Sequence, residues 1–405
     1  MLLFYLLGAT AIWLGWLSLR GGLRFSAYVR KQLTMPPSNF TPFVSIIAPF
    51  RGDEPQLREN VAALFQQQYP AYEVIFVTDS EEDLGLATIQ NVRALNADAL
   101  VRSRVLITGA ASDSGQKVHN LRKAVAEIDS HTEVIVFVDS DARPHEHWLS
   151  FLVAPLNDNS VGATTGYRWF VPPAFSIWGH LRSVWNASIA SALGAREDKN
   201  FCWGGSTAIR RERLLQLNVP ERWRGSVSDD FTLTRTLQDA KLPIKFVPQC
   251  LTATTGGCGL RELFEFTTRQ LKITHTYAAP LWKAALLGSA QFVLVFFGGM
   301  ILTMTRAMLG LSVKYGGALL AILFLLGAAK SLIRLRAVKL AMRDYQLKRH
   351  GEAIAQTLLW PFATLLFLYN TIAAALSRRI TWRGVTYELK SPVEAVIISR
   401  ETPPQ

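Results

Sequence analysis

Three acidic clusters in the middle of the chain contain the carboxylates best suited to chemistry. Asp139 and Asp141 follow the apolar run Val134–Val138, and two carboxylates one residue apart offer the hard oxygen ligands that Mg²⁺ and Mn²⁺ prefer. Asp79 follows a second apolar run. Asp229 and Asp230 open an amphipathic pattern, where a carboxylate can cap a helix or act as general base toward a hydroxyl. The clusters predict a divalent-ion site and a candidate base.

Basic and aromatic residues accompany these acids. Arg51 and Glu54 follow another β-branched run, and Lys117 lies in the glycine-containing stretch Ser112–Asn120, which runs into a helix pattern. Lys117 could meet a phosphate at the helix start or be an ordinary surface lysine. Trp203, Gly204 and Gly205 combine an indole with two glycines that allow close backbone approach to a ligand. The same segment could be a turn with a core tryptophan.

The elements that must position these residues alternate between short strands and helices. Strands are predicted at 44–48, 73–78, 105–108, 133–138, 161–167 and 244–247, and helices at 56–68, 117–128 and 176–193. Such alternation predicts an α/β fold with a mostly parallel sheet. Ligands bind at the carboxyl ends of the strands in such sheets. Glu54, Asp79 and the Asp139–Asp141 pair each follow a predicted strand, so the sequence predicts one site at this edge. An Asp-x-Asp motif that follows a buried strand is more informative than one in an isolated turn.

Apolar segments at both ends of the chain predict a membrane protein. Residues 1–19 carry no charge and are followed by Arg20, Arg24, Arg30 and Lys31, which indicates a retained anchor with its basic flank in the cytoplasm. Further spans are predicted at 284–305, 315–333 and 353–377, the last with Trp360–Pro361 in its middle, where an in-plane or re-entrant helix is expected. The net charge of +12 lies largely beside these segments, so anionic headgroups explain it better than nucleic acid does.

An amphipathic segment, Leu260–Tyr277, precedes the second apolar segment and carries Phe264, Phe266 and Arg269. This composition is typical of a helix in the membrane interface, where its cations could do no more than contact lipid headgroups. The chain thus divides into an anchor with basic flank (1–31), an α/β domain (43–254), an interfacial helix (260–281), membrane segments (282–377) and a basic tail (378–405).

Taken in order, these motifs resemble the membrane-bound family 2 inverting glycosyltransferases, most closely the ceramide glucosyltransferase-like branch. The resemblance covers about Phe43 to Ile273, the membrane segments and the tail motif Thr381-Trp382-Arg383-Gly384. It implies a GT-A-type nucleotide-sugar-binding domain. It also implies that Asp79 contacts the nucleobase of the donor and that Asp139 and Asp141 hold the metal. Of the Asp229-Asp230 pair, Asp230 would be the general base that takes a proton from the acceptor.

One family motif departs from its pattern. The (Q/R)xxRW motif falls on Arg269–Ile273, where Lys272 and Ile273 replace arginine and tryptophan. Lysine does not reproduce a guanidinium fork and isoleucine does not stack. Of the residues that define this motif, the sequence retains only the first arginine, Arg269.

The resemblance implies transfer of a hexose, with glucose expected, from a UDP-sugar to a membrane lipid hydroxyl with inversion. Mn²⁺ or Mg²⁺ is the expected cofactor, with donor contacts from Arg51, Glu54, Asp79, Lys117, Asp139 and Arg269. The acceptor region is expected at Trp203, Gly204, Gly205, Phe264 and Phe266. Two alternatives are a processive polysaccharide synthase, for which so few spans provide little channel wall, and a membrane-tethered nucleotide-sugar-binding pseudoenzyme, which would not need the intact acids.

Overall fold

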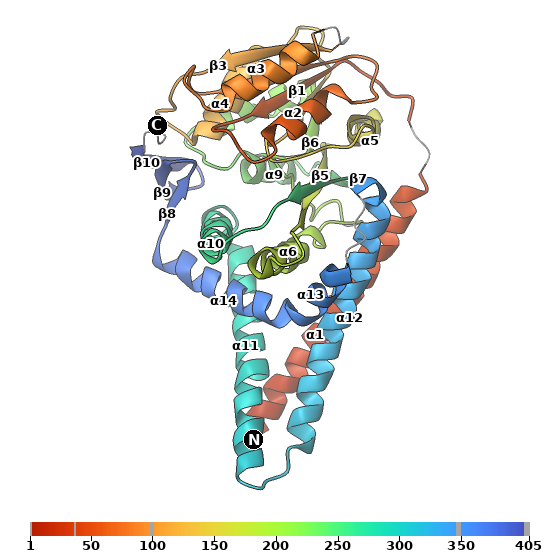
Figure 1. The fold of residues 1–405 in the computed structure, drawn as a ribbon, viewed down its shortest axis with the longest axis vertical. Coiled ribbons are helices and arrows are strands. Elements are labelled where there is room, and N and C mark those ends of the chain that lie inside the picture. The colour runs from red at the N-terminus through yellow and green to blue at the C-terminus, as the bar shows by residue number, and fades with distance from the viewer. Residues whose placement is uncertain (1, 36–37, 98–100, 346–349, 401–405) are drawn as a thin grey trace. The chain divides into compact units, whose positions relative to one another are not determined.

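The computed structural model describes residues 2–35, 38–97, 101–345 and 350–400 (Figure 1). These form two compact units. An α/β unit contains Lys31–Trp169, Leu193–Thr254 and Arg378–Gln405, and a helical unit contains Met1–Arg30, Phe170–Ala192 and Thr255–Ser377. The division differs from the predicted domains at two points, because residues 170–192 belong to the helical unit and the tail from Arg378 belongs to the α/β unit.

A seven-stranded sheet with the order β3-β2-β1-β4-β6-β5-β7 forms the centre of the α/β unit. Strands β1, β2, β3 and β4 are parallel, which confirms the predicted α/β class. Strand β6 runs antiparallel to both β4 and β5 and was not predicted, because four residues are too few to show a period. The strands are β1 (Val44–Pro49), β2 (Tyr72–Thr78), β3 (Arg102–Ile107), β4 (Val134–Phe137), β5 (Ala163–Val171), β6 (Thr207–Arg210) and β7 (Ile244–Thr255).

Helices cover this sheet because its central strands are apolar on both faces. Every residue of β1, β2 and β4 is buried, as expected where helices pack on both sides of a parallel sheet. Val118 and Leu121 of α4 and Leu233 of α9 share one core cluster with Ile47, Ile75 and Phe137 of the strands. The helices of this unit are α2 (Leu57–Phe65), α3 (Leu86–Leu95), α4 (Gln116–Ala126), α5 (Trp148–Val153), α7 (Arg211–Gln216), α8 (Val219–Arg222) and α9 (Asp229–Asp239).

The predicted basic tail is a small antiparallel sheet that packs within the α/β unit. Its strands are β8 (Arg379–Trp382), β9 (Val385–Ser391) and β10 (Glu394–Arg400). The buried Tyr387 hydroxyl accepts a hydrogen bond from the backbone N–H of Gln116 at 3.1 Å. A Cβ on Gly225, which has φ of 70°, would lie 1.9 Å from the carbonyl oxygen of Val393. This close approach requires glycine, so the tail is an integral part of the unit.

Among its described residues, the helical unit contains three helices long and apolar enough to cross a membrane, and a bent pair that would make a fourth if it is one span. Helices α1 (Leu2–Leu33), α11 (Ala279–Met308) and α12 (Lys314–Ala341) lie together (Figure 1) and share an apolar cluster around Ala11, Val295 and Leu319. The bent pair is α13 (His350–Leu358) and α14 (Trp360–Leu376), with an angle of 56° between them. The predicted break at Trp360–Pro361 is therefore present.

Helix α10 (Leu260–Tyr277) has the bounds that its amphipathic pattern predicts. Its apolar face packs on α6 (Ile177–Ala190) and α14 through Leu263, Leu271 and their neighbours. Phe266 contacts Trp185 of α6 edge to face at a ring separation of 6.2 Å, and Phe264 contacts Tyr369 of α14 at 4.8 Å. Both phenylalanines are thus part of the packing among these three helices.

Candidate active site

The acids that follow β2 and β4 lie at the same edge of the sheet. Both strands pair in parallel with β1, so their carboxyl ends point the same way. Arg51, just after β1, forms an ion pair with Asp79 at 3.3 Å, and the Asp79 side chain is only 10% exposed. Arg51 and Asp79, both predicted as donor contacts, therefore lie against each other.

The two carboxylates of the Asp-x-Asp motif are held by buried cations. Lys117 Nζ lies 2.7 Å from Asp139 Oδ1. Arg168 of β5 donates to Asp141 Oδ2 at 2.9 Å and to Asp139 Oδ2 at 3.4 Å. Burial by itself would raise the pKa of Asp139, but the charges of Lys117 and Arg168 hold that pKa below its usual value. Asp139 is consequently ionised at neutral pH.

Lys117 joins the Asp-x-Asp motif to the candidate catalytic pair. Its Nζ also lies 3.1 Å from Asp229 Oδ1, and its side chain is 13% exposed. Burial would lower the pKa of this amine, but the facing carboxylates of Asp139 and Asp229 raise it above its usual value. Of the two readings left open by the sequence, the surface lysine is wrong: Lys117 is a buried, charged group at the start of α4.

Glycine at position 204 permits this close packing. A Cβ there would lie 2.5 Å from both Asp229 Oδ2 and Lys117 Nζ, and a Cβ on Gly205 would lie 2.2 Å from the indole of Trp203. The Trp203 ring is buried and lies 4.8 Å from the guanidinium of Arg168, within cation-π range. Trp203 is thus a core tryptophan that stacks on Arg168, the arginine that contacts Asp139 and Asp141, and the two glycines bring the backbone close to these residues.

Asp229 and Asp230 have different surroundings. The cap of α9 is Ser228, whose hydroxyl accepts from the Phe231 N–H at 3.3 Å, so the alternative of Asp229 as the cap is wrong. Asp229 is buried, and burial raises its pKa to about 6, with Lys117 opposing this shift and Asp230 adding to it. Asp230 is partly exposed, and its Oδ1 accepts from the Ser228 hydroxyl and, at 2.7 Å, from the Phe231 N–H. Asp230 is therefore the more accessible of the two.

The residues present fit a divalent ion. Among the described residues there is no group of three or more metal-binding side chains, so a bound ion would need oxygens from donor or water. Asp141 Oδ1 is nevertheless a buried acceptor with no hydrogen-bond partner, and buried acceptors are normally satisfied. This orphaned oxygen, beside the ionised Asp139, is suited to a hard cation.

The sequence profile of glycosyl transferase family 21 matches residues 5–395. The chain belongs to that family. This confirms the resemblance to the ceramide glucosyltransferase-like enzymes and, with it, the GT-A-type assignment of the α/β unit.

Individual relatives of this family 21 chain are distant. Ceramide glucosyltransferase 1 from Caenorhabditis elegans is 26% identical over 100 residues, which make up 25% of this chain and 21% of that protein. The mannosyltransferase PcManGT from Pyrobaculum calidifontis, solved with GDP-Man and Mn²⁺, has a TM-score of 0.48 and 19% identity over 91% of this chain and 98% of its own. Glucosyl-3-phosphoglycerate synthase from Mycobacterium tuberculosis, solved with Mn²⁺ and uridine-diphosphate-glucose, has a TM-score of 0.35 and 14% identity over 58% and 78%.

Two residues of this family 21 site were not predicted. Arg168 lies one residue beyond the predicted strand 161–167, and inspecting the residue after each strand would have found it. Arg383 was noted only as part of the tail motif. In the structure it has φ of 52° in the β8-β9 turn and forms an ion pair with Glu54, the predicted donor contact. Glu54 also accepts from the Ser140 hydroxyl at 2.7 Å, so the tail reaches the Asp-x-Asp motif through Glu54.

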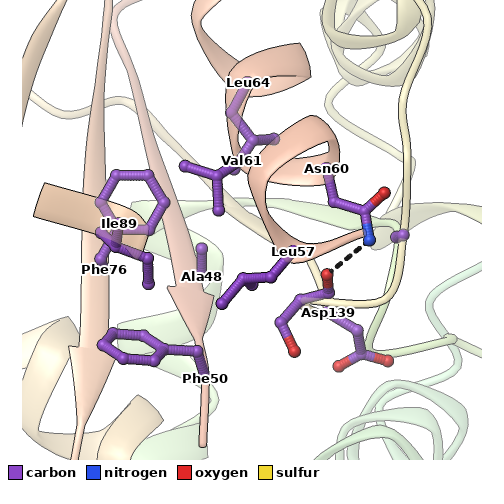
Figure 2. A pocket seen from close by; sticks show the side chains of 11 residues that line it. Ala48, Phe50, Leu57, Asn60, Val61, Leu64, Phe76, Ile89 and Asp139 are labelled. Atoms are coloured by element: carbon purple, nitrogen blue, oxygen red, sulfur yellow. Dashed lines mark hydrogen bonds between the residues drawn. The ribbon is translucent and has the colours of Figure 1, made fainter. Parts of the chain in front are cut away.

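Asn60 of α2 holds the backbone of the Asp-x-Asp motif by a hydrogen bond. Its side-chain amide donates to the backbone carbonyl of Ser140 at 2.9 Å. Figure 2 shows this bond at one end of a small, mainly apolar pocket between α2 and the strands, with Asp139 beside it. Asn60 also accepts from Arg143 at 3.0 Å. Asn60 thus fixes the backbone from which Asp139 and Asp141 project.

Three predicted site residues belong to the helical unit. Arg269, Phe264 and Phe266 are all on α10, where the Arg269 guanidinium lies 5.8 Å from the Phe266 ring. Ile273, the residue that replaces the family tryptophan, is buried on this helix. The structure brings together the remaining predicted residues in the α/β unit.

Proposed function

We propose that this family 21 chain transfers a hexose, with glucose expected, from a UDP-sugar to the hydroxyl of a membrane lipid with inversion. The observation that carries the proposal is the bridge that Lys117 makes between Asp139 and Asp229. It places a fixed positive charge between the acids suited to a metal-diphosphate and the acidic pair suited to base catalysis. A nucleotide-sugar transferase needs both in one site.

The reaction would be a single displacement. The acceptor oxygen forms a bond to the anomeric carbon as the bond from that carbon to the diphosphate oxygen breaks, UDP leaves, and Asp230 takes the hydroxyl proton. An ion bound at Asp139 and Asp141 would supply Lewis-acid stabilisation of the departing diphosphate. Lys117 and Arg168 would add fixed positive charge at the same place. Attack from the face opposite the leaving group gives a β-linked product from an α-linked donor.

Most of the remaining predicted residues also have a proposed place in this reaction. Arg51 orients Asp79 toward the nucleotide base, and Gly204 allows the sugar to approach the acids. Glu54 holds the motif through Ser140. On α10, Arg269 would assist the diphosphate, while Phe264 and Phe266 would shape the lipid side. Because they also pack on other helices, a change at either one needs a folding control.

The experiment that tests this function offers substrates to the purified full-length protein. UDP-glucose, other UDP-sugars and GDP-mannose would be incubated separately with a total membrane lipid extract and Mn²⁺, and the lipids would be analysed by mass spectrometry. The proposal expects a lipid heavier by one hexose with a UDP-sugar. A ladder of products would favour the polysaccharide synthase, and no product from any donor despite nucleotide binding would favour the pseudoenzyme.

We also propose that the α/β unit faces the cytoplasm, as the basic flank of α1 suggests. Cys202 and Cys250 are buried, so a Cys258→Ser background leaves few competing thiols. Glu212 of α7 is exposed, and Glu212→Cys should react with an impermeant thiol reagent only after the membrane is opened. Labelling of intact cells would reverse the assigned orientation.

A further inference from the structure

Two cations of α12 lie one helical turn apart in the helical unit. Lys330 and Arg334 are separated by four positions, so they share one face of the helix. Lys330 Nζ donates to the Ser18 hydroxyl of α1 at 2.7 Å. Arg334 Nη2 donates to Gln356 Oε1 of α13 at 2.8 Å. Arg334 is 3% exposed and Gln356 is fully buried, so three helices enclose this cationic face.

The cluster of Lys330, Arg334 and Gln356 has buried hydrogen-bond donors that lack acceptors. Arg334 Nε and Gln356 Nε2 are buried and have no hydrogen-bond partner, and both are donors. Within the described part of the chain, neither Lys330 nor Arg334 forms an ion pair with a carboxylate. Glu352, one turn before Gln356, is buried and has an interaction of its own. A buried cation without a counter-ion is costly, so the cluster is suited to an acceptor-rich anion.

The position of the cluster along α12 indicates which anion is available. Arg334 is twenty residues beyond Lys314, the first residue of the helix, and at ~1.5 Å per residue this is about 30 Å. That length equals the thickness of a bilayer hydrocarbon core, about 30 Å. Lys330 and its partner Ser18 lie one turn closer to the bilayer centre. Arg334 therefore falls at the level of the lipid headgroups, where phosphates are the abundant anions.

We propose that Lys330, Arg334 and Gln356 form a binding site for the phosphate of an anionic membrane phospholipid. Arg334 offers a planar fork to the phosphate oxygens, Lys330 offers a point charge from the adjacent turn, and the free Gln356 N–H donates a further hydrogen bond. The bound lipid would join α1, α12 and α13. This site is separate from sugar transfer and does not depend on the proposed acceptor.

The experiment uses the full-length protein in detergent with equal amounts of phosphatidylglycerol and phosphatidylcholine, and counts retained lipids by native mass spectrometry. The wild-type protein is expected to retain one phosphatidylglycerol in preference to phosphatidylcholine. Since a direct hydrogen bond to a charged group contributes about 1.5 kcal/mol or more, Arg334→Gln should weaken phosphatidylglycerol retention by about tenfold. Lys330→Gln with Arg334→Gln should weaken it by about 100-fold.

Arg336→Gln is the matched control, because Arg336 is exposed on the same helix and its loss removes the same charge. It should retain phosphatidylglycerol like the wild type. Equal retention of the two lipids by the wild type, or unchanged retention by Arg334→Gln, would overturn the site. The wild-type comparison needs no variant, so misfolding of a mutant does not prevent a decision. Displacement of the lipid by equimolar inorganic phosphate would show that soluble phosphate, not a lipid, is the ligand.

Discussion

The ammonium group of Lys117 lies 3.1 Å from the carboxylate of Asp229, although the two residues are more than one hundred positions apart in the chain. Asp229 comes from the first turn of α9 and Lys117 from the first turn of α4. The pair leaves the neighbouring Asp230 without a cation at this distance among the described residues, so the two adjacent aspartates have different surroundings. Asp229 is buried against Lys117, whereas Asp230 is partly exposed.

Removal of the Lys117 charge should abolish most transfer. Lys117→Met keeps an apolar stem but leaves Asp139 and Asp229 facing each other in a buried site, and the loss of one such electrostatic group typically costs ~10²–10³-fold in rate. We expect kcat/KM for the UDP-sugar to fall by that amount. Lys123→Met, at an exposed position of the same helix, is the control and should retain activity. Equal activity of the two variants would contradict the bridging role.

Asp230→Asn should separate base catalysis from structure. The asparagine oxygen can still accept a hydrogen bond from the Phe231 N–H, so the start of α9 is preserved. The neutral amide cannot, however, take the proton from the attacking lipid hydroxyl. Transfer should fall ~10²–10⁴-fold while UDP binding, measured by calorimetry, stays near the wild-type value. Asp229→Asn should retain more activity than Asp230→Asn. The reverse order would assign the base to Asp229.

The pH profile should show the state of Asp229. Its folded pKa of about 6 lies above the ordinary value of 3.8, so this carboxyl contributes stability below about pH 4 and that contribution is lost as the pH rises through 6. Activity runs the opposite way, because only ionised Asp229 holds Lys117. We expect kcat/KM to fall below about pH 6, and this limb should be absent in Asp229→Asn. A limb at the same pH in both proteins would belong to another group.

Gly204→Ala should disturb the site directly. The added Cβ would meet both Asp229 Oδ2 and Lys117 Nζ at 2.5 Å, a distance that requires at least one of them to move. Transfer should fall by at least tenfold, the cost of about 1.4 kcal/mol in transition-state binding, with the fold retained by circular dichroism. A Cβ at Gly194 meets nothing within 4 Å, so Gly194→Ala is the control. A normal rate for Gly204→Ala would show that the ion pair is dispensable.

Metal use should depend on Asp141. Its buried Oδ1 has no partner, so Asp141→Ala removes the acceptor best placed for an added ion. Mn²⁺ binding, followed by electron paramagnetic resonance in the presence of UDP, should weaken sharply, and chelator should inactivate the wild-type protein. Full turnover by Asp141→Ala in excess chelator would exclude this metal site.

Local sequence patterns determined the parts of this protein that short-range chemistry specifies. Continuous β-branched runs marked β1, β2 and β4, because strands buried on both faces are apolar throughout. The amphipathic period marked α10 to the residue, and the apolar lengths marked α1, α11 and α12. Since strand-end residues in a parallel sheet converge, Asp79, Asp139 and Asp141 were also identifiable from the sequence.

Tertiary structure decided which distant residues meet. Arg168 reaches both Asp139 and Asp141 because β5 enters the sheet beyond the short antiparallel β6. Strand β6 has too few residues to be predicted from its sequence pattern. Arg383 meets Glu54 only because the tail folds back as a small sheet onto the start of α4. Ion pairs between segments far apart in the chain depend on topology and packing, so the local periodicity of the sequence does not predict them. The acids, Arg51 and Lys117 could therefore be found in the sequence, whereas the contacts that Arg168 and Arg383 make, and the pairing of all these charges, required the fold.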